Sequence, residues 1–218
     1  STGIQNTLIG GLAGDALTDA DYNVAVGVTA LGGDTLGSKS TAIGYSTLVN
    51  QNFTTATDSH NTAVGYEAGA AVTTGRFDTI VGSLAGDAVT TGVANVAIGY
   101  NALSTEDTGS KSVAVGANAL LTQNNDAENF NIGVGDSAGR LITTGIKNTI
   151  IGGEAGDAIT DADRNVAVGF DAMSQNTIGS ESVAIGTFAL NAQNPTTATN
   201  MYNVAVGHNT GAAITTGK

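Results

Sequence analysis

A short apolar run, represented by residues 95–99 (NVAIG), recurs along the chain with spacings of 17, 17, 21, 17, 17, 17, 19, 17, 17, 17 and 21 residues. In all twelve copies the second residue is Thr, Val or Ile, the fourth is Val or Ile, and the fifth is Gly. Such a run, bounded by Gly and polar residues, is typical of a short buried strand. The twelve copies therefore predict stacked strands that share one core. They begin at Asn6, Asn23, Ser40, Asn61, Asp78, Asn95, Ser112, Asn131, Asn148, Asn165, Ser182 and Asn203.

A longer period is superimposed on this repeat, and it shows in the residue four positions after the fifth-position Gly. Along the chain that residue is Gly, Leu, Leu, Gly, three times over, with Met173 replacing one Leu. The three copies that begin with Ser come third in each set, and each precedes a long spacing. We therefore expect one repeat domain, 1–218, made of super-repeats 6–77, 78–147 and 148–218. Because residues 2–4 match residues 144–146 and the chain ends at the same phase, we expect a window of a longer repetitive fibre.

Side chains in a strand alternate between two faces. Val96 and Ile98 therefore share one face, and Ala97 lies on the other with Gly99 beside it. We expect one face to pack inside the coil, and the other, lined by small residues, to permit close approach of a second layer. No polar residue alternates into the run, so the pattern predicts apolar surface that is shared between chains. Twelve strands at the usual spacing give a rod about 58 Å long.

The composition supports this fold class. The chain has 31 Gly, one Pro, no Cys and no Trp, and aromatic residues make up only 5%. Small and β-branched side chains suit thin sheet-lined structures. The fold class that we predict is therefore all-β, a parallel β-roll or β-solenoid of about twelve coils.

Charge and hydropathy exclude several functions. The net charge of −12, with a pI of about 4.1, argues against nucleic-acid binding, which needs a basic face. It also disfavours docking on anionic lipid. No run of apolar residues is long enough to span a bilayer. We therefore expect no nucleic-acid partner and no direct membrane contact.

The run Asn-Val-Ala-Ile-Gly followed by x-x-Ala resembles the YadA-like head repeat of trimeric autotransporter adhesins. Closely similar repeats, with the Thr-Thr-Gly turn seen at 90–92, occur in phage tail fibres. The resemblance covers essentially the whole chain. It implies a left-handed parallel β-roll, three chains packed into a homotrimer, and an extracellular adhesive or spacer fibre on a bacterial surface or a virion. Its implied partners are the other two chains and a host-surface glycan or protein. Family head repeats are commonly shorter than these, and a four-unit super-repeat is not required by the family.

The three long spacings are candidate binding loops. They cover residues 49–60, 121–130 and 191–202, and each follows the pattern Leu-x-x-Gln-Asn and carries an aromatic residue. Insertions in a solenoid become loops on one face, often the binding face. The loops are either receptor or glycan contacts, or tolerated bulges whose aromatics cover a neighbouring coil or subunit. The candidate residues are Gln51, Asn52, Phe53, Gln123, Asn124, Phe130, Gln193, Asn194 and Tyr202.

Two acidic turns are candidate calcium sites. Asp19 and Asp21, and likewise Asp161 and Asp163, place carboxylates at alternate positions, as calcium loops do. The equivalent turn of the middle super-repeat, at 91–93, lacks these acids, so simple turn chemistry is the alternative. A monomeric solenoid that binds calcium, or ice through its Thr pairs, is accordingly the second functional hypothesis. We expect no other cofactor.

Catalytic residues are scarce in this sequence. His60 and His208 are the only histidines, and no carboxylate recurs beside them at a fixed spacing. There is no Cys nucleophile and no G-x-S-x-G segment. We therefore expect a protein without enzymatic activity.

Overall fold

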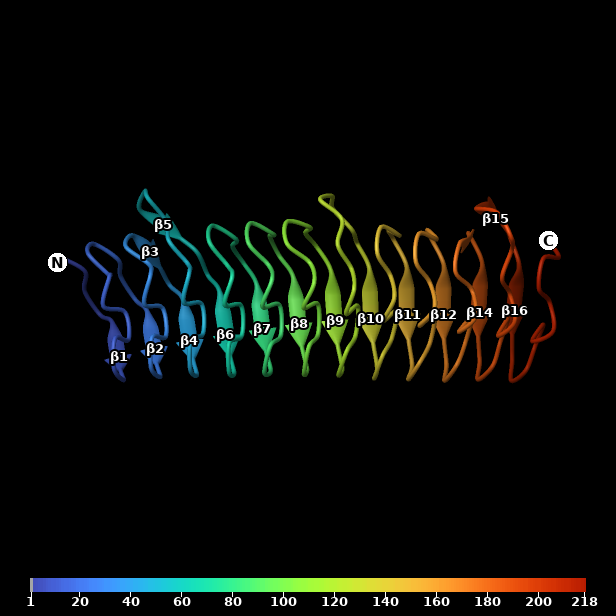
Figure 1. Ribbon diagram of the computed structural model, residues 1–218, viewed down its shortest axis with the longest axis horizontal. Helices are drawn as coiled ribbons and strands as arrows, with labels where there is room; N and C mark the ends of the chain where they lie inside the picture. The colour runs from blue at the N-terminus through green and yellow to red at the C-terminus, as the bar shows by residue number, and fades with distance from the viewer. Residues whose placement is uncertain (1) are drawn as a thin grey trace.

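The chain folds into a solenoid of stacked coils, as the computed structural model shows for residues 2–218 (Figure 1). Each coil contributes one three-residue strand to a single twelve-stranded sheet, and every neighbouring pair in it is parallel. The strands pair in register, so that Val96 lies opposite Val113 and Ala97 opposite Ala114. The prediction of an all-β parallel solenoid of about twelve coils is confirmed. The strands are β1 (Thr7–Ile9), β2 (Val24–Val26), β4 (Thr41–Ile43), β6 (Thr62–Val64), β7 (Thr79–Val81), β8 (Val96–Ile98), β9 (Val113–Val115), β10 (Ile132–Val134), β11 (Thr149–Ile151), β12 (Val166–Val168), β14 (Val183–Ile185) and β16 (Val204–Val206).

The three long spacings project from the solenoid on the side away from this sheet (Figure 1). In the first super-repeat β3 (Gly37–Ser38) pairs with β5 (Thr57–Asp58), and in the third β13 (Gly179–Ser180) pairs with β15 (Thr199–Asn200). In the middle super-repeat the same position holds an isolated bridge between Ser110 and Glu128. Each loop is therefore joined to the coil before it by a short parallel ladder.

The orientation of the strands reverses one expectation from the sequence. Ala97 points inward and has no exposed surface, whereas Ile98 points outward with 36% of its surface exposed. The small residue is inside because the coil is thin. A larger inward side chain fits only where a neighbouring interior residue is small. The outer face of the sheet is consequently lined by Val, Ile and Thr rather than by small residues.

The Gly-Leu-Leu-Gly period describes two kinds of interior. In the glycine coils the buried space is filled by an aliphatic side chain three residues later, such as Val72, Val89, Ile142 or Ile159. In the leucine coils the Leu or Met itself fills the core, and the residue three positions later is buried and polar. These polar residues form three pairs on adjacent coils, which we call the buried polar pairs: Asp34 and Gln51, Glu106 and Gln123, and Asn176 and Gln193.

The first residue of each coil forms a hydrogen-bonded ladder inside the corner that precedes the strand. Asn148 shows the pattern, since its Oδ1 accepts the backbone N–H of Asn165 at 2.9 Å and its Nδ2 donates to the carbonyl of Ala162 at 2.8 Å. A buried amide is stabilising only when its polar atoms are paired. Stacking identical amides in register meets this condition, which explains why Asn recurs at this position.

The invariant Gly that follows each strand is required by close approach of the backbone. At Gly99 the φ angle is 135°, and a Cβ would lie 2.4 Å from the carbonyl oxygen of Gly116 on the next coil. No L-residue with a side chain fits such a site. Replacing this Gly would separate two coils and break the ladder beside it.

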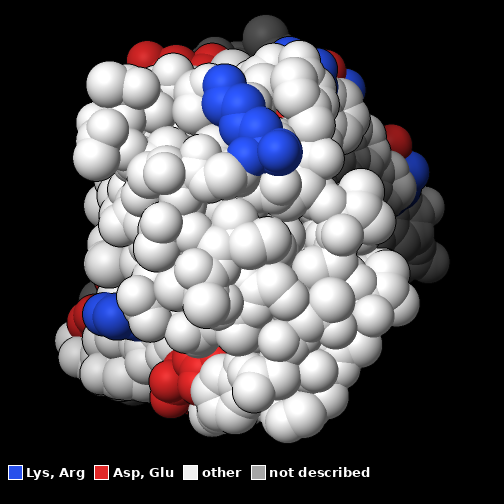
Figure 2. Space-filling view, turned by 90° about the vertical axis from the view of Figure 1, so that its right-hand side faces the viewer, with Lys and Arg blue, Asp and Glu red and all other residues white. Residues whose placement is uncertain are grey.

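The solenoid presents few charged side chains at one end. Figure 2 looks along its axis onto the end that carries β16, and most of that surface is uncharged. Within the described residues no helix is long and apolar enough to cross a membrane.

Candidate functional site

The glutamines of the three loops are interior residues, which corrects the prediction that they contact a ligand. Gln51, Gln123 and Gln193 have no exposed surface. The Nε2 atom of Gln123 donates to Glu106 Oε2 at 2.9 Å and to Ser112 Oγ at 2.8 Å, while its Oε1 accepts from Asn131 Nδ2 at 2.9 Å. These residues hold the coils together and are not available to a partner.

This network explains why Ser replaces Asn in the same coils that carry long spacings. Ser40 is smaller than Asn, and the Gln51 side chain occupies the space that this leaves, with Nε2 donating to Ser40 Oγ at 2.9 Å. The amide oxygen of Gln51 then accepts from Asn61 Nδ2 at 2.9 Å. A Ser and a Gln together replace one Asn, and the loop supplies the Gln.

The acid of the buried polar pair differs between super-repeats. Asp34 accepts from Gln51 Nε2 at 2.6 Å, and burial raises the pKa of the Glu106 carboxyl in the second pair. In the third pair Asn176 bonds the backbone of Gly179, and the Gln193 Nε2 has no hydrogen-bond partner among residues 2–218. The first residue of the buried polar pair thus varies between Asp, Glu and Asn, while the second is always Gln.

The asparagines of the loops are exposed. Asn52 accepts from the Thr35 hydroxyl at 2.9 Å, and Asn194 accepts from the Thr177 hydroxyl at 2.8 Å. The backbone N–H of Asn124 donates to the carbonyl of Thr143 at 3.1 Å. Their side chains face solvent while they anchor the loop to neighbouring coils.

Each loop carries an aromatic residue, but the three rings do not occupy equivalent positions. Phe53 is only 5% exposed and packs over Gly37, whereas Phe130 is 45% and Tyr202 65% exposed. Phe130 and Tyr202 stand immediately before the first residue of the next coil, at a corner where the backbone is left-handed, with φ near 52° and 54°. The residue at this corner in the first super-repeat is His60, with φ near 54°.

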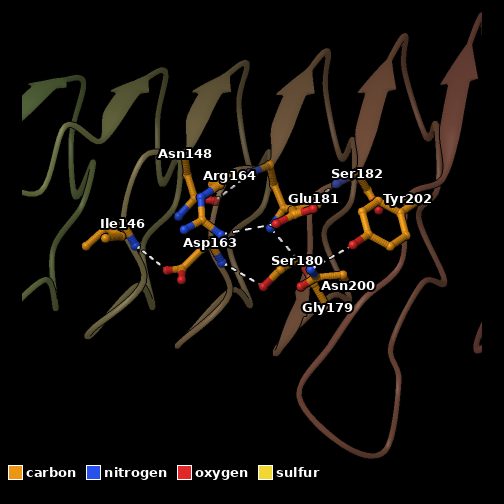
Figure 3. A network of polar contacts seen from close by, with 11 residues as sticks. Ile146, Asn148, Asp163, Arg164, Gly179, Ser180, Glu181, Ser182, Asn200 and Tyr202 are labelled. Atoms are coloured by element: carbon orange, nitrogen blue, oxygen red, sulfur yellow. Dashed lines mark hydrogen bonds and ion pairs between the residues drawn. The ribbon is translucent and has the colours of Figure 1, made fainter.

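The four acids proposed for calcium lie on the outer turns. Asp19 Oδ1 accepts from the Thr2 hydroxyl at 2.5 Å, and Asp21 Oδ1 accepts the backbone N–H of Ile4 at 2.8 Å. The second pair repeats this arrangement. Asp161 Oδ1 accepts from the Thr144 hydroxyl, and Asp163 Oδ1 accepts the N–H of Ile146 at 2.8 Å (Figure 3). Each acid therefore joins its coil to the preceding one. Residues 2–218 contain no group of three or more His, Cys, Asp and Glu side chains that could hold a metal ion.

A groove of about 650 Å³ lies beside the first loop, at the corner that carries His60. The His60 ring stacks on Phe77 with centroids 5.6 Å apart and planes 13° from parallel, and the Arg76 guanidinium lies 5.6 Å from the centre of the Phe77 ring. Asp58 lies in the same groove, held by Lys39 at 2.6 Å, and this hydrogen bond lowers the pKa of the Asp58 carboxyl.

The groove brings together residues that are far apart in sequence. Asp19 and Asp21 of the first coil line it together with residues of the next three coils. The sequence signal that could have found it is the position just before each Asn, Ser or Asp of the ladder. That position is exposed in eleven of the twelve coils and partly exposed in the other, at Glu181. His208 lies elsewhere, after the last strand, edge-on to Phe188 at 6.2 Å.

The corner chemistry partly recurs along the rod. In the third super-repeat Asp163 N–H donates to Ser180 Oγ at 2.9 Å, Arg164 pairs with Glu181 at 3.1 Å, and Asn200 Nδ2 donates to the Tyr202 hydroxyl at 3.0 Å (Figure 3). The corner is therefore a polar and aromatic strip with a period of four coils.

Comparison with known proteins gives no relative. No family model, no curated protein and no solved structure matches the chain.

Proposed function

We propose that the chain is a segment of a homotrimeric adhesive fibre, in which three left-handed β-rolls pack through the outer face of the twelve-stranded sheet. The fibre acts as a stiff extracellular spacer on a bacterial surface or a virion, and its side loops bind a surface glycan or protein. This role is mechanical and requires no catalysis. The observation that carries the proposal is the chemistry of that outer face.

The outer face of the sheet is uncharged over its whole length and mostly apolar. The fourth residue of every coil is Val or Ile, the second is Val, Ile or Thr, and no charged residue interrupts them. Ile43, Ile98, Ile151 and Ile185 are each more than one third exposed. The strip is on the order of 50 Å long and 10 Å wide, about 500 Å², which is at the upper end of what monomers expose.

Aromatic residues widen this strip. Tyr45, Tyr66, Tyr100 and Phe170 each follow the Gly at the end of a strand and are about half exposed. Tyr45 and Tyr66 stack with ring centroids 5.3 Å apart. A flat apolar strip with an aromatic border is typical of a protein interface, where Tyr and Phe are enriched. Copies of the same chain fit it because their coils have the same axial spacing, and the resemblance to adhesin head repeats supports three copies.

Light scattering tests the assembly. We expect a solution mass near three times the chain mass of 21.5 kDa. Val115→Lys places a charge at the middle of the strip, and we expect it to shift the mass toward the monomer because an unpaired charge would be buried. Thr144→Lys, on an exposed turn away from the strip, is the control and should remain trimeric. A clean monomer for the unmodified chain would contradict the proposal.

A further inference from the structure

We infer that the groove beside loop 49–60 binds a short uncharged oligosaccharide, an assignment that rests on the adhesive role proposed above and names the ligand class of one site. The groove opens at the side of the rod and extends from the first coil to the fourth. Three coil steps give it a length of roughly 14 Å. That length suits several linked sugar rings better than a single one.

The aromatic pair supplies an apolar platform. Phe77 and His60 stack on each other, which covers one face of each ring, and both residues are exposed to solvent over the rest of the pair. An aromatic face attracts the C–H face of a pyranose, because the negative face of the ring meets weakly positive hydrogens and both surfaces leave water. The left-handed backbone at both residues, with φ of 63° and 54°, turns their side chains outward from the corner.

The polar groups around this platform suit sugar hydroxyls. Asp19 and Asp21 each use Oδ1 for a bond between coils, and among residues 2–218 no hydrogen bond engages the second oxygen of either carboxylate. Arg76 offers planar N–H donors beside Phe77. Vicinal hydroxyls both donate and accept, so carboxylate and guanidinium groups around an aromatic face match their hydrogen-bonding pattern.

Charge decides between classes of sugar. Three carboxylates, from Asp19, Asp21 and Asp58, line the groove with one guanidinium, from Arg76. The nearby Lys39 is already bonded to Asp58. An anionic sugar would bring a further negative charge into an acidic groove, within a chain of net charge −12, and like charges at close range are unfavourable. The groove therefore favours an uncharged ligand over a uronic or sialic acid.

The trimeric protein should be titrated with three neutral trisaccharides (maltotriose, cellotriose and chitotriose) and with trigalacturonate as the anionic probe. We expect saturable binding of at least one neutral trisaccharide, and weaker or no binding of trigalacturonate. Phe77→Ala should weaken the binding about ten-fold or more, because it removes one ring of the platform. The matched control is Lys147→Ala, at the equivalent corner of the second super-repeat, which should leave the binding unchanged.

Circular dichroism and solution mass keep the test interpretable. If Phe77→Ala does not fold, Asp21→Asn, which preserves shape and the bond to Ile4 but replaces the second oxygen with a donor, should still reduce affinity in a folded trimer. The assignment is overturned if no neutral trisaccharide binds, if trigalacturonate binds more tightly, or if Phe77→Ala binds as well as the unmodified chain. These outcomes leave a trimer in place, whereas failure of the proposed fibre would appear as a monomer before any sugar is added.

Discussion

At the scale of single residues, Asp78 is the one ionisable residue in the ladder, where the other positions hold Asn or Ser. It keeps two ladder bonds, since its N–H donates to Asn61 Oδ1 at 3.0 Å and its Oδ1 accepts the N–H of Asn95 at 2.8 Å. The Asn residues of the ladder donate Nδ2 to a carbonyl fourteen residues ahead, as Asn95 does to Gly109. Asp78 has an oxygen in that place, and its Oδ2 is buried with no hydrogen-bond partner in the described part of the chain. A protonated carboxyl would donate to Gly92, as an amide does.

Asp78→Asn should reduce the pH dependence of stability. Burial raises the pKa of Asp78 from 3.8 to about 7 in the folded chain. Between these values the folded state holds a proton that the unfolded state has lost, so stability falls as pH rises from about 4 to about 7 and is lowest above that range. The loss is on the order of 2–4 kcal/mol. Asn carries both hydrogens at every pH, so denaturation of Asp78→Asn should show a smaller slope than the unmodified chain and greater stability at pH 8. The slope that remains comes from Glu106, Asp87 and Asp157, whose pKa values burial also raises.

The control for this experiment is Asp58→Asn. Lys39 lowers the pKa of the exposed Asp58 carboxyl, so replacing it leaves the slope between pH 4 and 7 unchanged. Protein concentration must be constant, because the stability of an assembly depends on it. An equal slope in Asp78→Asn and in the unmodified chain would show that Asp78 does not carry the proton.

At the scale of the elements, two neighbouring loop residues, one buried and one exposed, allow the contribution of the buried side chain to stability to be measured. Gln123→Ala should destabilise the fold by about 2–4 kcal/mol, because it removes the buried hydrogen bonds to Glu106, Ser112 and Asn131, while Glu106 keeps only those from Gly109 and Asn129. Asn124→Ala changes an exposed side chain in the same loop and should cost less than about 0.5 kcal/mol. Chemical denaturation of both variants measures the difference. Similar losses for the two would mean that the loop, and not the buried glutamine, holds the adjacent coils.

The sequence predicts the elements well and their orientation poorly. The twelve repeats predict the strands reliably, because short apolar runs at so regular a spacing can bury their side chains together only by stacking one coil on the next. The direction of Ala97 could not be predicted, since both faces of the strand are apolar and alternation alone does not identify the inner one. The burial of Gln51 was detectable in principle, because a Ser at the ladder position, such as Ser40, is always followed by a longer spacing. The Gln in that spacing fills the room that the smaller Ser leaves.

The candidate site was likewise predictable in part. Phe130 and Tyr202 stand one residue before a ladder position, whereas Phe53 stands eight residues before Asn61, so counting back from the ladder separates the exposed rings from the buried one. The groove itself was beyond prediction. It joins Asp19 to Phe77 across coils, and only the stacking geometry at the corner brings these two residues to one surface.

At the scale of the whole molecule, the order of coil types controls what can be removed. Glycine and leucine coils alternate in pairs, so each buried acid or Asn176 meets one glutamine on the next coil. Deleting residues 78–147 removes four coils and joins the first super-repeat to the third with this order intact. Deleting residues 40–94 removes only three coils, but it places the coil of Asp34 directly against the coil of Glu106.

We therefore predict that the shorter protein is the more stable one. Without residues 40–94, the buried Asp34 loses Gln51 and faces a second carboxylate at the position where Gln51 stood. A buried charge without its partner costs about 3–5 kcal/mol, and one of two adjacent carboxylates must take up a proton. Thermal unfolding at equal concentration should place the chain without 78–147 closer to the full-length protein and the chain without 40–94 lower. Small-angle scattering should show the first shortened by about 19 Å, four strand spacings. If stability instead followed the number of remaining coils alone, the buried polar pairs would not set the register of the rod.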